Sequence, residues 1–471
     1  MASLGLLATT IARPVFFFGL LTSLAFLAHA LFLTKLALST VLIVAHFFLE
    51  LIVSYAALIQ SAVGALSYLI VGAGLYYLMA PHPVAFAAPR INMATLKKTN
   101  WKEVEWTQKL APMRTGKKYA VIGAGFVGKK LIHSLLLRGE NHIVALDMDP
   151  TACDVFKNDP RVKFIRGNVT KYEDVLAAVR GADVVFSTFA IIRYMDRLDS
   201  QAALSYNINV FGTENVIRAC QECGVKALVQ TSTSNVSVNG LQCTLDMDEK
   251  VDYVTRETSP NHYGWTKAIA EQLVLKADGV AGVRTGAVRP CSSVFGADDR
   301  HMLDGFLKLG RTPLPPNGGA TCLDFIGVMN VVWGHLLLEK ALLERPDDGV
   351  AGEAFCVSNN GPMRLIDFCH IVNYFRPGGL VMIPTPYRLL TLVAKVVEGL
   401  HGIGYKVPGQ LGTLTTATVE FLELSYAFSS RKAQQRLGYE PLFTVEQAVQ
   451  MSVDEWQQGQ MLPALPKTIA A

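Results

Sequence analysis

Apolar residues follow two different patterns along the chain. Residues 14–80 are apolar almost throughout, and Lys35 and Glu50 are the charged residues among them. A helix needs about 20 apolar residues to cross the core of a bilayer. This first region therefore predicts two or three transmembrane helices. After residue 118, short apolar runs instead alternate with stretches that have helical spacing, which is typical of an α/β domain.

The alternating region predicts a parallel β-sheet. We expect strands at residues 119–122, 143–146, 162–165, 182–186, 227–229 and 283–288, with helices at 172–179 and 215–223. A strand, a helix and a second parallel strand pack together with a right-handed crossover. The fold class that we predict is therefore α/β, with a Rossmann-type, doubly wound parallel sheet.

A linker separates the two regions. Pro81-His-Pro83 ends the last apolar stretch, and the density of charged residues rises after it. Two tryptophans of this segment, Trp101 and Trp106, are expected either at a bilayer surface or on a short helix packed against the globular domain. The predicted boundaries are 1–80 for the membrane helices and 81–117 for the linker.

Basic residues indicate how the membrane region is oriented. Arg13 precedes it, whereas the residues that follow it include Arg90, Lys97, Lys98 and Lys102. Cytosolic flanks of membrane helices carry an excess of Lys and Arg, so we expect residue 90 onward to be cytosolic. His46 and Glu50 lie four residues apart, and they mark either a polar site in the membrane or a loop between two shorter helices.

A glycine-rich loop follows the first strand of the predicted sheet. Gly123-Ala-Gly125-Phe-Val-Gly128 opens an amphipathic helix, and Asp147 ends the next apolar run. Glycine permits a tight turn and a close approach of the backbone to a pyrophosphate, while the helix N-terminus offers unpaired N–H groups. An acid about 20 residues further on can bind ribose hydroxyls. The pattern predicts a dinucleotide site; a turn without a ligand is the alternative.

Tyr263 and Lys267 are the candidate catalytic pair. They lie four residues apart and share one face of a helix, which we expect to start at Ser259-Pro260. A neighbouring ammonium favours phenolate and lowers the pKa of a tyrosine, which is otherwise about 10. The pair can then take a proton from an alcohol. The fifth predicted strand ends in hydroxyl-bearing residues that can orient such an alcohol, namely Thr231, Ser232, Thr233 and Ser234.

Composition limits the classes of function. Charged residues make up 17% of the chain and the mean hydropathy is +0.29, which agrees with part of the chain lying in a membrane. The net charge is +4 and no basic tract alternates with aromatic residues, so we expect no nucleic-acid partner. Cys220 and Cys223 form a CxxC on a predicted helix, without a second ligand pair, so we expect free thiols and no metal.

Several motifs together resemble the extended short-chain dehydrogenases/reductases. The most similar branch is that of the 3β-hydroxysteroid dehydrogenases, including the sterol-4α-carboxylate 3-dehydrogenases. The resemblance covers residues 119–458 and does not extend to the N-terminal spans. Its motifs are GAGFVG at 123–128, Asn209-Val-Phe-Gly212-Thr213-Glu-Asn215, TSTSNV at 231–236, Tyr263-Gly-Trp-Thr-Lys267, Arg289-Pro290 with Val294-Phe295-Gly296, DFIGVMNVV at 324–332, Tyr426-Ala-Phe-Ser429 with Lys432-Ala, and Leu437-Gly438-Tyr439.

The resemblance implies a role for each of these sites. Tyr263 would accept the proton, Lys267 would bind the nicotinamide ribose and tune Tyr263, and Thr233 would orient the alcohol, with Ser232 or Ser234 as alternatives. Asp147 would hold the adenosine ribose, and because no Arg follows it directly, NAD is favoured over NADP. The implied cofactor-binding residues are Gly123, Gly125, Phe126, Val127, Gly128, Asp147, Asn168, Tyr263, Lys267 and Pro290.

Two further boundaries follow from the same resemblance. Residues 118–300 would form the NAD-binding Rossmann domain, and 301–460 a smaller α+β substrate-binding region that is partly interleaved with it. The segment 387–400 has apolar residues at helical spacing. It is either a core-facing helix or an apolar substrate entrance near the membrane.

Three residues depart from the pattern of the family. Ile122 stands where a glycine is usual, Asn168 where an adenine-contacting Asp is common, and Gly327 where a Tyr is frequent. The first two concern the affinity for the cofactor, and Gly327 concerns the substrate side.

The leading hypothesis is a membrane-anchored, NAD-dependent oxidation of the 3β-hydroxyl of a sterol. The preferred substrate is a 4α-carboxysterol, whose 3-keto product would lose carbon dioxide. A dehydrogenase/isomerase, a nucleotide-sugar epimerase or dehydratase, and an inactive NAD-binding membrane scaffold stay open as alternatives. Expected partners are a sterol or steroid-like lipid, the membrane, and a second copy or other sterol-pathway membrane enzymes. The resemblance implies the endoplasmic reticulum, with the catalytic domain in the cytosol.

Overall fold

The computed structural model describes residues 22–24, 91–100, 105–192, 199–239, 244–299, 302–314, 321–359, 361–408, 410–421, 425–459 and 461. The chain divides into two compact units, and the larger one holds residues 82–312, 317–382 and 390–471. The predicted membrane spans lie outside the described residues, apart from Thr22–Leu24, as do His46 and Glu50. Among the residues that are described, no helix has both the length and the apolar character needed to span a bilayer.

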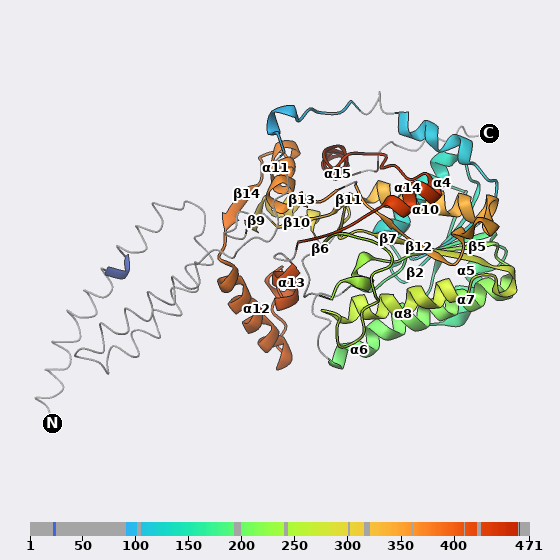
Figure 1. Cartoon of the computed structure of the whole chain (residues 1–471), viewed down its shortest axis with the longest axis horizontal. Coiled ribbons are helices and arrows are strands. Elements are labelled where there is room, and N and C mark those ends of the chain that lie inside the picture. Colours follow the sequence, from blue (N-terminus) through green and yellow to red (C-terminus); the bar gives the residue numbers. More distant parts are fainter. Residues whose placement is uncertain are drawn as a thin grey trace, which may run out of the picture. The chain divides into compact units, whose positions relative to one another are not determined.

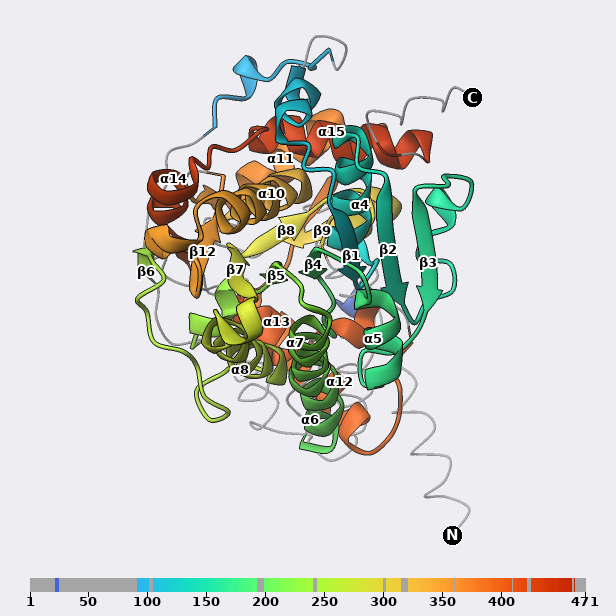
Figure 2. The same cartoon turned by 90° about the vertical axis from the view of Figure 1, so that its right-hand side faces the viewer.

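A seven-stranded parallel sheet forms the centre of the larger unit (Figure 2). Its strand order is β12-β7-β5-β4-β1-β2-β3, with β1 between β4 and β2. Six strands lie at the positions expected from the apolar runs. The seventh, β12, joins the edge of the sheet from beyond residue 300. The strands are β1 (Lys118–Ile122), β2 (His142–Asp147), β3 (Val162–Arg166), β4 (Val184–Ser187), β5 (Ala227–Thr231), β7 (Arg284–Pro290) and β12 (Glu353–Val357).

Helices cover both faces of this sheet (Figure 1). One face is covered by α4 (Phe126–Arg138) and α10 (Val328–Glu344), and the other by α5 (Tyr172–Val179), α7 (Gly212–Cys223) and α8 (His262–Lys276). Helix α6 (Asp199–Tyr206) leads directly into a π-helical turn, η5 (Asn207–Phe211), and this turn leads directly into α7. Parallel strands flanked by helices on both faces confirm the predicted Rossmann-type α/β fold.

Smaller sheets and further helices lie outside the seven-stranded sheet. The order β13-β10-β15-β6 forms a four-stranded sheet, and β11-β8 and β14-β9 form two-stranded ones. The strands are β6 (Thr244–Met247), β8 (Ser293–Phe295), β9 (Arg311–Leu314), β10 (Cys322–Leu323), β11 (Phe325–Gly327), β13 (Met363–Arg364), β14 (Val381–Pro384) and β15 (Tyr426–Phe428). The helices are α9 (Leu303–Leu309), α11 (Leu365–Phe375), α12 (Tyr387–Gly402), α13 (Thr416–Phe421), α14 (Arg431–Leu437) and α15 (Val445–Gln458).

The linker packs on the globular domain where it is described. It forms short 3₁₀ helices at Met93–Thr95, Glu105–Lys109 and Ala111–Met113. Trp106 is 6% exposed, and its ring meets that of Phe443 at 5.6 Å between centroids. The packed helix is therefore the correct alternative for Trp106, while Trp101 lies outside the described residues.

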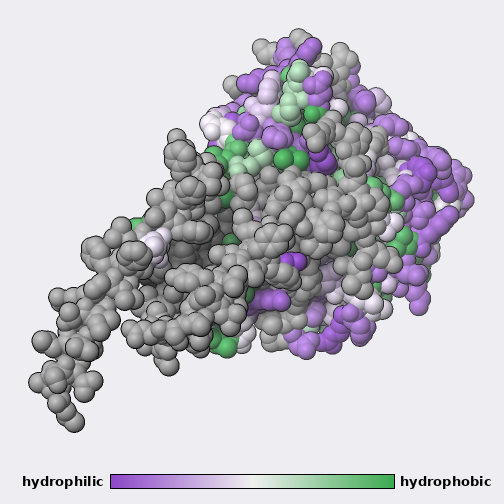
Figure 3. All heavy atoms as spheres, turned by 60° about the vertical axis from the view of Figure 1, so that its left-hand side comes forward, coloured by the Kyte–Doolittle hydropathy of each residue, from purple (hydrophilic) through white to green (hydrophobic). Residues whose placement is uncertain are grey.

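The surface of the described part is mainly polar, with one concentration of apolar side chains. Hydrophilic residues cover much of the coloured surface in Figure 3, and smaller apolar areas lie between them. Helix α12, predicted at 387–400, buries Leu390, Ala394 and Val397 but exposes Leu392 and Val396. The turn after it exposes further large apolar residues, Ile403 and Tyr405. Scattered apolar residues are normal on a surface, whereas a group of them on one helix invites a functional explanation.

A buried ionic cluster joins β1, α4 and α10. The Arg138 guanidinium donates to the Glu339 carboxylate at 2.6 and 3.0 Å, and Glu140 lies 3.0 Å from Arg138 Nε. The Tyr119 hydroxyl donates to Glu339 Oε1 at 2.6 Å. The side chains of Arg138, Glu140 and Glu339 are fully buried. Charges taken out of water must be paired, so this cluster fixes the three elements against one another.

We predict that Glu339→Gln destabilises the protein by about 3 kcal/mol, because it leaves the buried Arg138 without its main counter-charge. Denaturant unfolding of the purified protein measures the change. The matched control is Glu344→Gln on the same helix. Glu344 faces Lys340 across 4.0 Å on the surface, so its loss changes the free energy of unfolding by less than about 1 kcal/mol. Equal effects of the two substitutions would contradict the prediction.

Candidate active site

The candidate residues meet at the carboxyl edge of the parallel sheet. The glycine loop follows β1, Asp147 ends β2, Thr233 follows β5, and Pro290 ends β7. Carboxyl ends of parallel strands share one edge, where ligands bind in folds of this kind. Helix α8 brings Tyr263 and Lys267 to this edge, because it starts beside the segment that follows β5. The structure therefore gathers residues that are up to 167 positions apart in the sequence.

Two glycines of the loop are required by the backbone. Gly123 has φ +98°, and a Cβ built there would lie 2.5 Å from the backbone N of Phe189. A Cβ on Gly128 would lie 2.0 Å from Gly123 O, so the first turn of α4 packs directly on the loop. Left-handed φ and this close approach both exclude larger side chains.

Gly125 has a different role from its two neighbours. A Cβ built on it meets no heavy atom within 4 Å, so the protein itself leaves the space beside it open. Gly125 is the N-cap of α4 and its cap makes no side-chain hydrogen bond. The N–H groups of the first turn, which begins with Phe126 and Val127, therefore face an open cradle. Such a cradle at a helix N-terminus fits the pyrophosphate of a dinucleotide.

Asp147 and Asn168 follow the neighbouring strands. Asp147 is the last residue of β2, and its Oδ1 accepts a hydrogen bond from Asp149 N at 2.9 Å. Asn168 lies just after β3, and its Oδ1 accepts from both N and Oγ1 of Thr170 at 3.0 Å. Both side chains are thus held by local turns at the same edge of the sheet.

Two of the departures from the family pattern have structural explanations. Ile122 is the last residue of β1, and its side chain is fully buried in the core between the sheet and α5 and α7. The left-handed backbone that the turn needs falls on Gly123 instead, so Ile122 is compatible with the loop. A Cβ on Gly327 would lie 2.5 Å from that of Ala448, so this glycine permits α15 to pack on β11.

Helix α8 begins later than the sequence suggested. Its N-cap is Asn261, whose Oδ1 accepts from Gly264 N at 3.0 Å. The expected start at Ser259-Pro260 is therefore wrong, because the Asn261 side chain supplies the cap. A Cβ on Gly264 would lie 2.8 Å from Asn235 O. This glycine lets the first turn of α8 approach the segment after β5, which places Tyr263 beside Thr233.

Thr233 is the hydroxyl that meets Tyr263. It caps the short 3₁₀ helix Ser234–Ser237, where its Oγ1 accepts from Asn235 N at 3.2 Å, and it lies close enough to Tyr263 to lower the pKa of that phenol. The Ser232 hydroxyl is buried without a protein partner, and Ser234 Oγ accepts from Ser292 N at 2.9 Å. Of the three candidate hydroxyls, this arrangement favours Thr233.

Burial sets the protonation of the catalytic pair. It raises the pKa of Tyr263 to about 12, and the hydrogen bond from Thr233 acts in the opposite direction. Burial also lowers the pKa of Lys267 to about 8, against the attraction of Glu271. The expectation that Lys267 lowers the pKa of Tyr263 is not met in this arrangement. The reason is geometric, because Lys267 Nζ donates to Thr231 O at 2.7 Å.

His335 is a residue of this site that the sequence did not reveal. It lies on α10 on the opposite face of the sheet and is fully buried. Its Nε2 lies 2.6 Å from Thr231 Oγ1, and its Nδ1 lies 2.8 Å from Val331 O. Burial, together with the charge of Lys267, lowers the pKa of His335 to about 4. A single histidine in an apolar helix gives no sequence signal for such a contact.

The end of β7 approaches the same point. Pro290 pairs with Val357 of β12. Two residues later, Ser292 has φ +52°, and its N–H is held by Ser234. A non-glycine residue in this region of φ is strained and is often found near a functional site.

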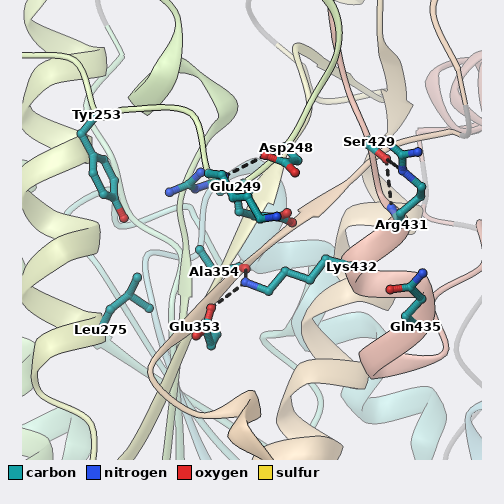
Figure 4. Close-up of a pocket in the computed structure, with 12 residues that line it drawn as sticks. Asp248, Glu249, Tyr253, Leu275, Glu353, Ala354, Ser429, Arg431, Lys432 and Gln435 are labelled. Atoms are coloured by element: carbon teal, nitrogen blue, oxygen red, sulfur yellow. Dashed lines mark hydrogen bonds and ion pairs between the residues drawn. The ribbon is translucent and has the colours of Figure 1, made fainter.

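One cavity of the described residues lies away from this edge. It has a volume of about 650 Å³ and is lined by residues of α8, β12, α14 and the segment after β6. Figure 4 shows Lys432 of α14 paired with Glu353 across it, and Arg431 beside Ser429. At its floor Arg289 is paired with Glu271 at 2.6 Å. None of the residues expected to bind cofactor or to act in catalysis lines this cavity.

No group of three or more His, Cys, Asp or Glu side chains within the described residues is placed to hold a metal ion. Cys220 is fully buried and Cys223 is half-buried, and both are free thiols. Burial raises the pKa of each thiol, so neither is a ready nucleophile.

Comparison with known proteins agrees with this geometry. The chain is similar to "3beta-hydroxysteroid-dehydrogenase/decarboxylase isoform 1" of Arabidopsis thaliana, with 30% identity over 71% of this chain and 78% of that protein. It is also similar to "3 beta-hydroxysteroid dehydrogenase/Delta 5-->4-isomerase" of Mycobacterium tuberculosis, with 32% identity over 69% of this chain and 86% of that protein.

Solved structures show the same fold. A dTDP-glucose 4,6-dehydratase from Streptomyces venezuelae with NAD bound superimposes with a TM-score of 0.55 and 17% identity, covering 72% of this chain and 97% of that one. At this identity the likeness shows the fold alone. The model of the "3-beta hydroxysteroid dehydrogenase/isomerase family" matches residues 120–375. With the cofactor loop, the Tyr263–Thr233 contact and Lys267 in place, the chain belongs to this family of NAD(P)-dependent oxidoreductases.

Proposed function

We propose that the protein oxidises the 3β-hydroxyl of a sterol with NAD, and that its substrate is a 4α-carboxysterol. The observation that carries the proposal is the contact between Thr233 and Tyr263 beside Lys267, at the sheet edge that also holds the glycine loop. A buried base, a hydroxyl that orients the alcohol and a dinucleotide cradle are what the removal of a proton and a hydride from one carbinol requires.

Each side chain has one task in this reaction. Tyr263, as phenolate, takes the proton of the 3β-hydroxyl, and Thr233 orients that hydroxyl through its own hydrogen bond. Lys267, held by the Thr231 carbonyl at 2.7 Å, would bind the nicotinamide ribose. NAD, when bound, supplies the acceptor for the hydride of C3, and its charged ring favours the same phenolate. Burial excludes water from the site, so interactions between these charges are screened less than in solution.

The choice of NAD over NADP rests on Asp147. Its carboxylate at the end of β2 can accept the two hydroxyls of an adenosine ribose, while it would repel a 2′-phosphate. Met148, the next residue, offers no positive charge that would reverse this preference.

Decarboxylation needs little beyond the oxidation. Once C3 is a ketone, a carboxylate on C4 is a β-keto acid. Its C4–carboxyl bond breaks with release of carbon dioxide, and the electron pair is delocalised into the ketone as an enolate, which is then protonated at C4. The Arabidopsis relative is named a dehydrogenase/decarboxylase, which supports this substrate, whereas the mycobacterial relative is named a dehydrogenase/isomerase. Isomerisation would need a further base beside C4.

The first test is a panel of substrates. Detergent-solubilised, full-length protein with NAD should form NADH and release carbon dioxide with a 4α-carboxysterol. We expect Tyr263→Phe to lower this rate by about 10²- to 10⁴-fold, because a positioned general base contributes that much. Tyr172→Phe is the matched control, since the Tyr172 hydroxyl contacts Glu222 on the surface.

Other outcomes of the panel favour the alternatives. Formation of NADH with plain 3β-hydroxysteroids, together with a shifted double bond in the product, would favour a dehydrogenase/isomerase. Turnover of a UDP-sugar alone would favour an epimerase-like enzyme. NAD binding without turnover of any alcohol would favour an inactive scaffold.

The cofactor cradle gives a second prediction. Gly125→Ala should weaken NAD binding by about ten-fold or more, because its methyl group would occupy the space left for the pyrophosphate, and the melting temperature should stay unchanged. Titration calorimetry with NAD and NADP measures the affinities. Gly399→Ala on α12 is the control, since a Cβ there also meets no atom within 4 Å. Wild-type NAD affinity in the Gly125→Ala variant would contradict the assignment of this loop as the pyrophosphate site.

A third prediction concerns the membrane. We propose that the exposed apolar residues of α12, Leu392 and Val396, rest on a bilayer that holds the sterol. The double substitution Leu392→Glu, Val396→Glu should raise KM for a sterol presented in vesicles and leave kcat for a detergent-dispersed sterol unchanged. Val280→Glu, at an apolar residue that is 50% exposed on another element, should change neither. Equal KM values for the two variants would refute a role of α12 at a membrane.

A further inference from the structure

Thr231 connects two residues that lie on opposite faces of the sheet. Its carbonyl oxygen accepts from Lys267 Nζ at 2.7 Å, and its hydroxyl lies 2.6 Å from His335 Nε2. Lys267 belongs to α8 and His335 to α10, and these helices cover opposite faces. Thr231 is the last residue of β5, and Thr233 follows two positions later. One residue therefore joins the candidate catalytic pair to a histidine behind the sheet.

The hydrogen bonds define the tautomer of His335. A backbone carbonyl can only accept, so the Nδ1 that lies 2.8 Å from Val331 O carries the proton. Burial lowers the pKa of His335 to about 4, so the ring is neutral near pH 7. Nε2 is then an acceptor, and the Thr231 hydroxyl must donate to it. Both ring nitrogens and the Thr231 hydroxyl are satisfied by this single arrangement.

The position of His335 is itself fixed. Glu339 lies one turn further along α10 on the same face, and it is locked by Arg138 and Tyr119. His335 is fully buried and its ring lies 6.4 Å from that of Phe186 on β4. The imidazole can neither leave the protein interior nor exchange Thr231 for water. It is a rigid acceptor placed under the end of β5.

We propose that His335 is a positioning residue of the dehydrogenase site. By accepting the Thr231 hydroxyl, it fixes the end of β5, so that the Thr231 carbonyl holds Lys267 and the next turn presents Thr233 to Tyr263. This inference rests on the proposed function, because it assigns catalytic importance to Lys267 and Tyr263. His335 touches neither substrate nor cofactor, and its effect is transmitted through the backbone of one residue.

Two substitutions at position 335 separate this role from simple packing. A glutamine places its Oε1 near the position of Nε2, so His335→Gln keeps an acceptor for Thr231. An asparagine ends near the position of Nδ1, so His335→Asn keeps the contact to Val331 and loses the acceptor. We expect His335→Asn to lower kcat/KM by about 10- to 100-fold, since small misplacements of catalytic groups cost that much. His335→Gln should restore most of it.

Thr231 gives the reciprocal test. Thr231→Val removes the hydroxyl without changing the shape of the side chain, and Thr231→Ser keeps it. Thr231→Val should match the loss of His335→Asn, and the double variant should lose no more than either one, because both remove one interaction. His370→Asn, on α11 away from this contact, is the control and should behave as wild type.

The pH profile distinguishes positioning from a general loss of stability. The Thr231 carbonyl stabilises the ammonium form of Lys267, so losing this contact lowers the pKa of Lys267 further. The ionisable groups near Lys267 are Glu271 on the same helix, which acts in the opposite direction, Tyr263 one turn earlier on that helix, and the neutral His335. In His335→Asn and Thr231→Val we therefore expect the alkaline limb of the activity profile to move to lower pH. A purely structural role would reduce activity without moving this limb.

The tautomer is tested without any turnover. In protein labelled with ¹⁵N-histidine, the His335 resonances, assigned by their loss in His335→Gln, should show a protonated Nδ1 and an unprotonated Nε2. Thr231→Val should shift the Nε2 resonance. An Nε2-protonated ring, or full activity and an unchanged pH profile in His335→Asn and Thr231→Val, would overturn the proposal. If instead the wild-type protein oxidises no sterol while the tautomer is as expected, the proposed function fails and the contact itself stands.

Discussion

The end of β5 is held by hydrogen bonds from three directions, and the candidate site depends on them. The Thr231 carbonyl accepts from Lys267, the Thr231 hydroxyl donates to His335, and Ser232 N donates to Val288 O at 2.7 Å. A strand end is usually the point where the chain begins to move freely. Here it is held from both faces of the sheet, and the candidate hydroxyl of Thr233 follows two positions later. Preorganisation of this kind removes the cost of ordering these groups at the moment of reaction.

Burial of the catalytic pair has two opposing consequences. It raises the pKa of Tyr263 to about 12 and lowers that of Lys267 to about 8, so burial disfavours the charged form of both, although Lys267 stays mainly protonated near pH 7. The same burial strengthens every charge that enters the site, because little water remains to screen it. A positive charge beside Tyr263, such as the ring of an oxidised nicotinamide cofactor, would therefore favour the phenolate.

Local sequence patterns predicted most of the fold, but they did not predict the contacts of α10 with the end of β5. The apolar runs predicted six strands of the sheet within a few residues, because a buried parallel strand is a short, continuous apolar segment. The glycine loop and the Tyr263–Lys267 spacing were also visible in the sequence, since each is a pattern within a few consecutive residues. The start of α8 was misplaced because Asn261 caps it.

The other features depend on contacts that no local pattern encodes. His335 contacts Thr231, which lies 104 positions earlier in the chain. Gly264 can approach Asn235 because it has no side chain. Strand β12 joins the sheet from beyond the predicted Rossmann domain. Spacing rules apply within one element, whereas these contacts are set by the packing of separate elements. The burial that dominates the pKa of Tyr263 is likewise a property of the assembled edge, so the sequence suggested the wrong leading cause.

Helix α10 connects the two halves of the site from behind the sheet. Val331, His335 and Glu339 are spaced four residues apart, so they lie along one face of this helix. Glu339 binds Tyr119 of β1 and Arg138 of α4, which are the strand and helix of the cofactor loop. His335 binds Thr231 of β5, which is the strand that precedes the candidate hydroxyl of Thr233. Because charges and polar groups buried this deeply cannot exchange their partners for water, a shift of α10 along its axis would break both contacts together. The helix thus fixes the glycine loop and the segment of Thr233 relative to each other, although neither His335 nor Glu339 lies among the candidate catalytic residues.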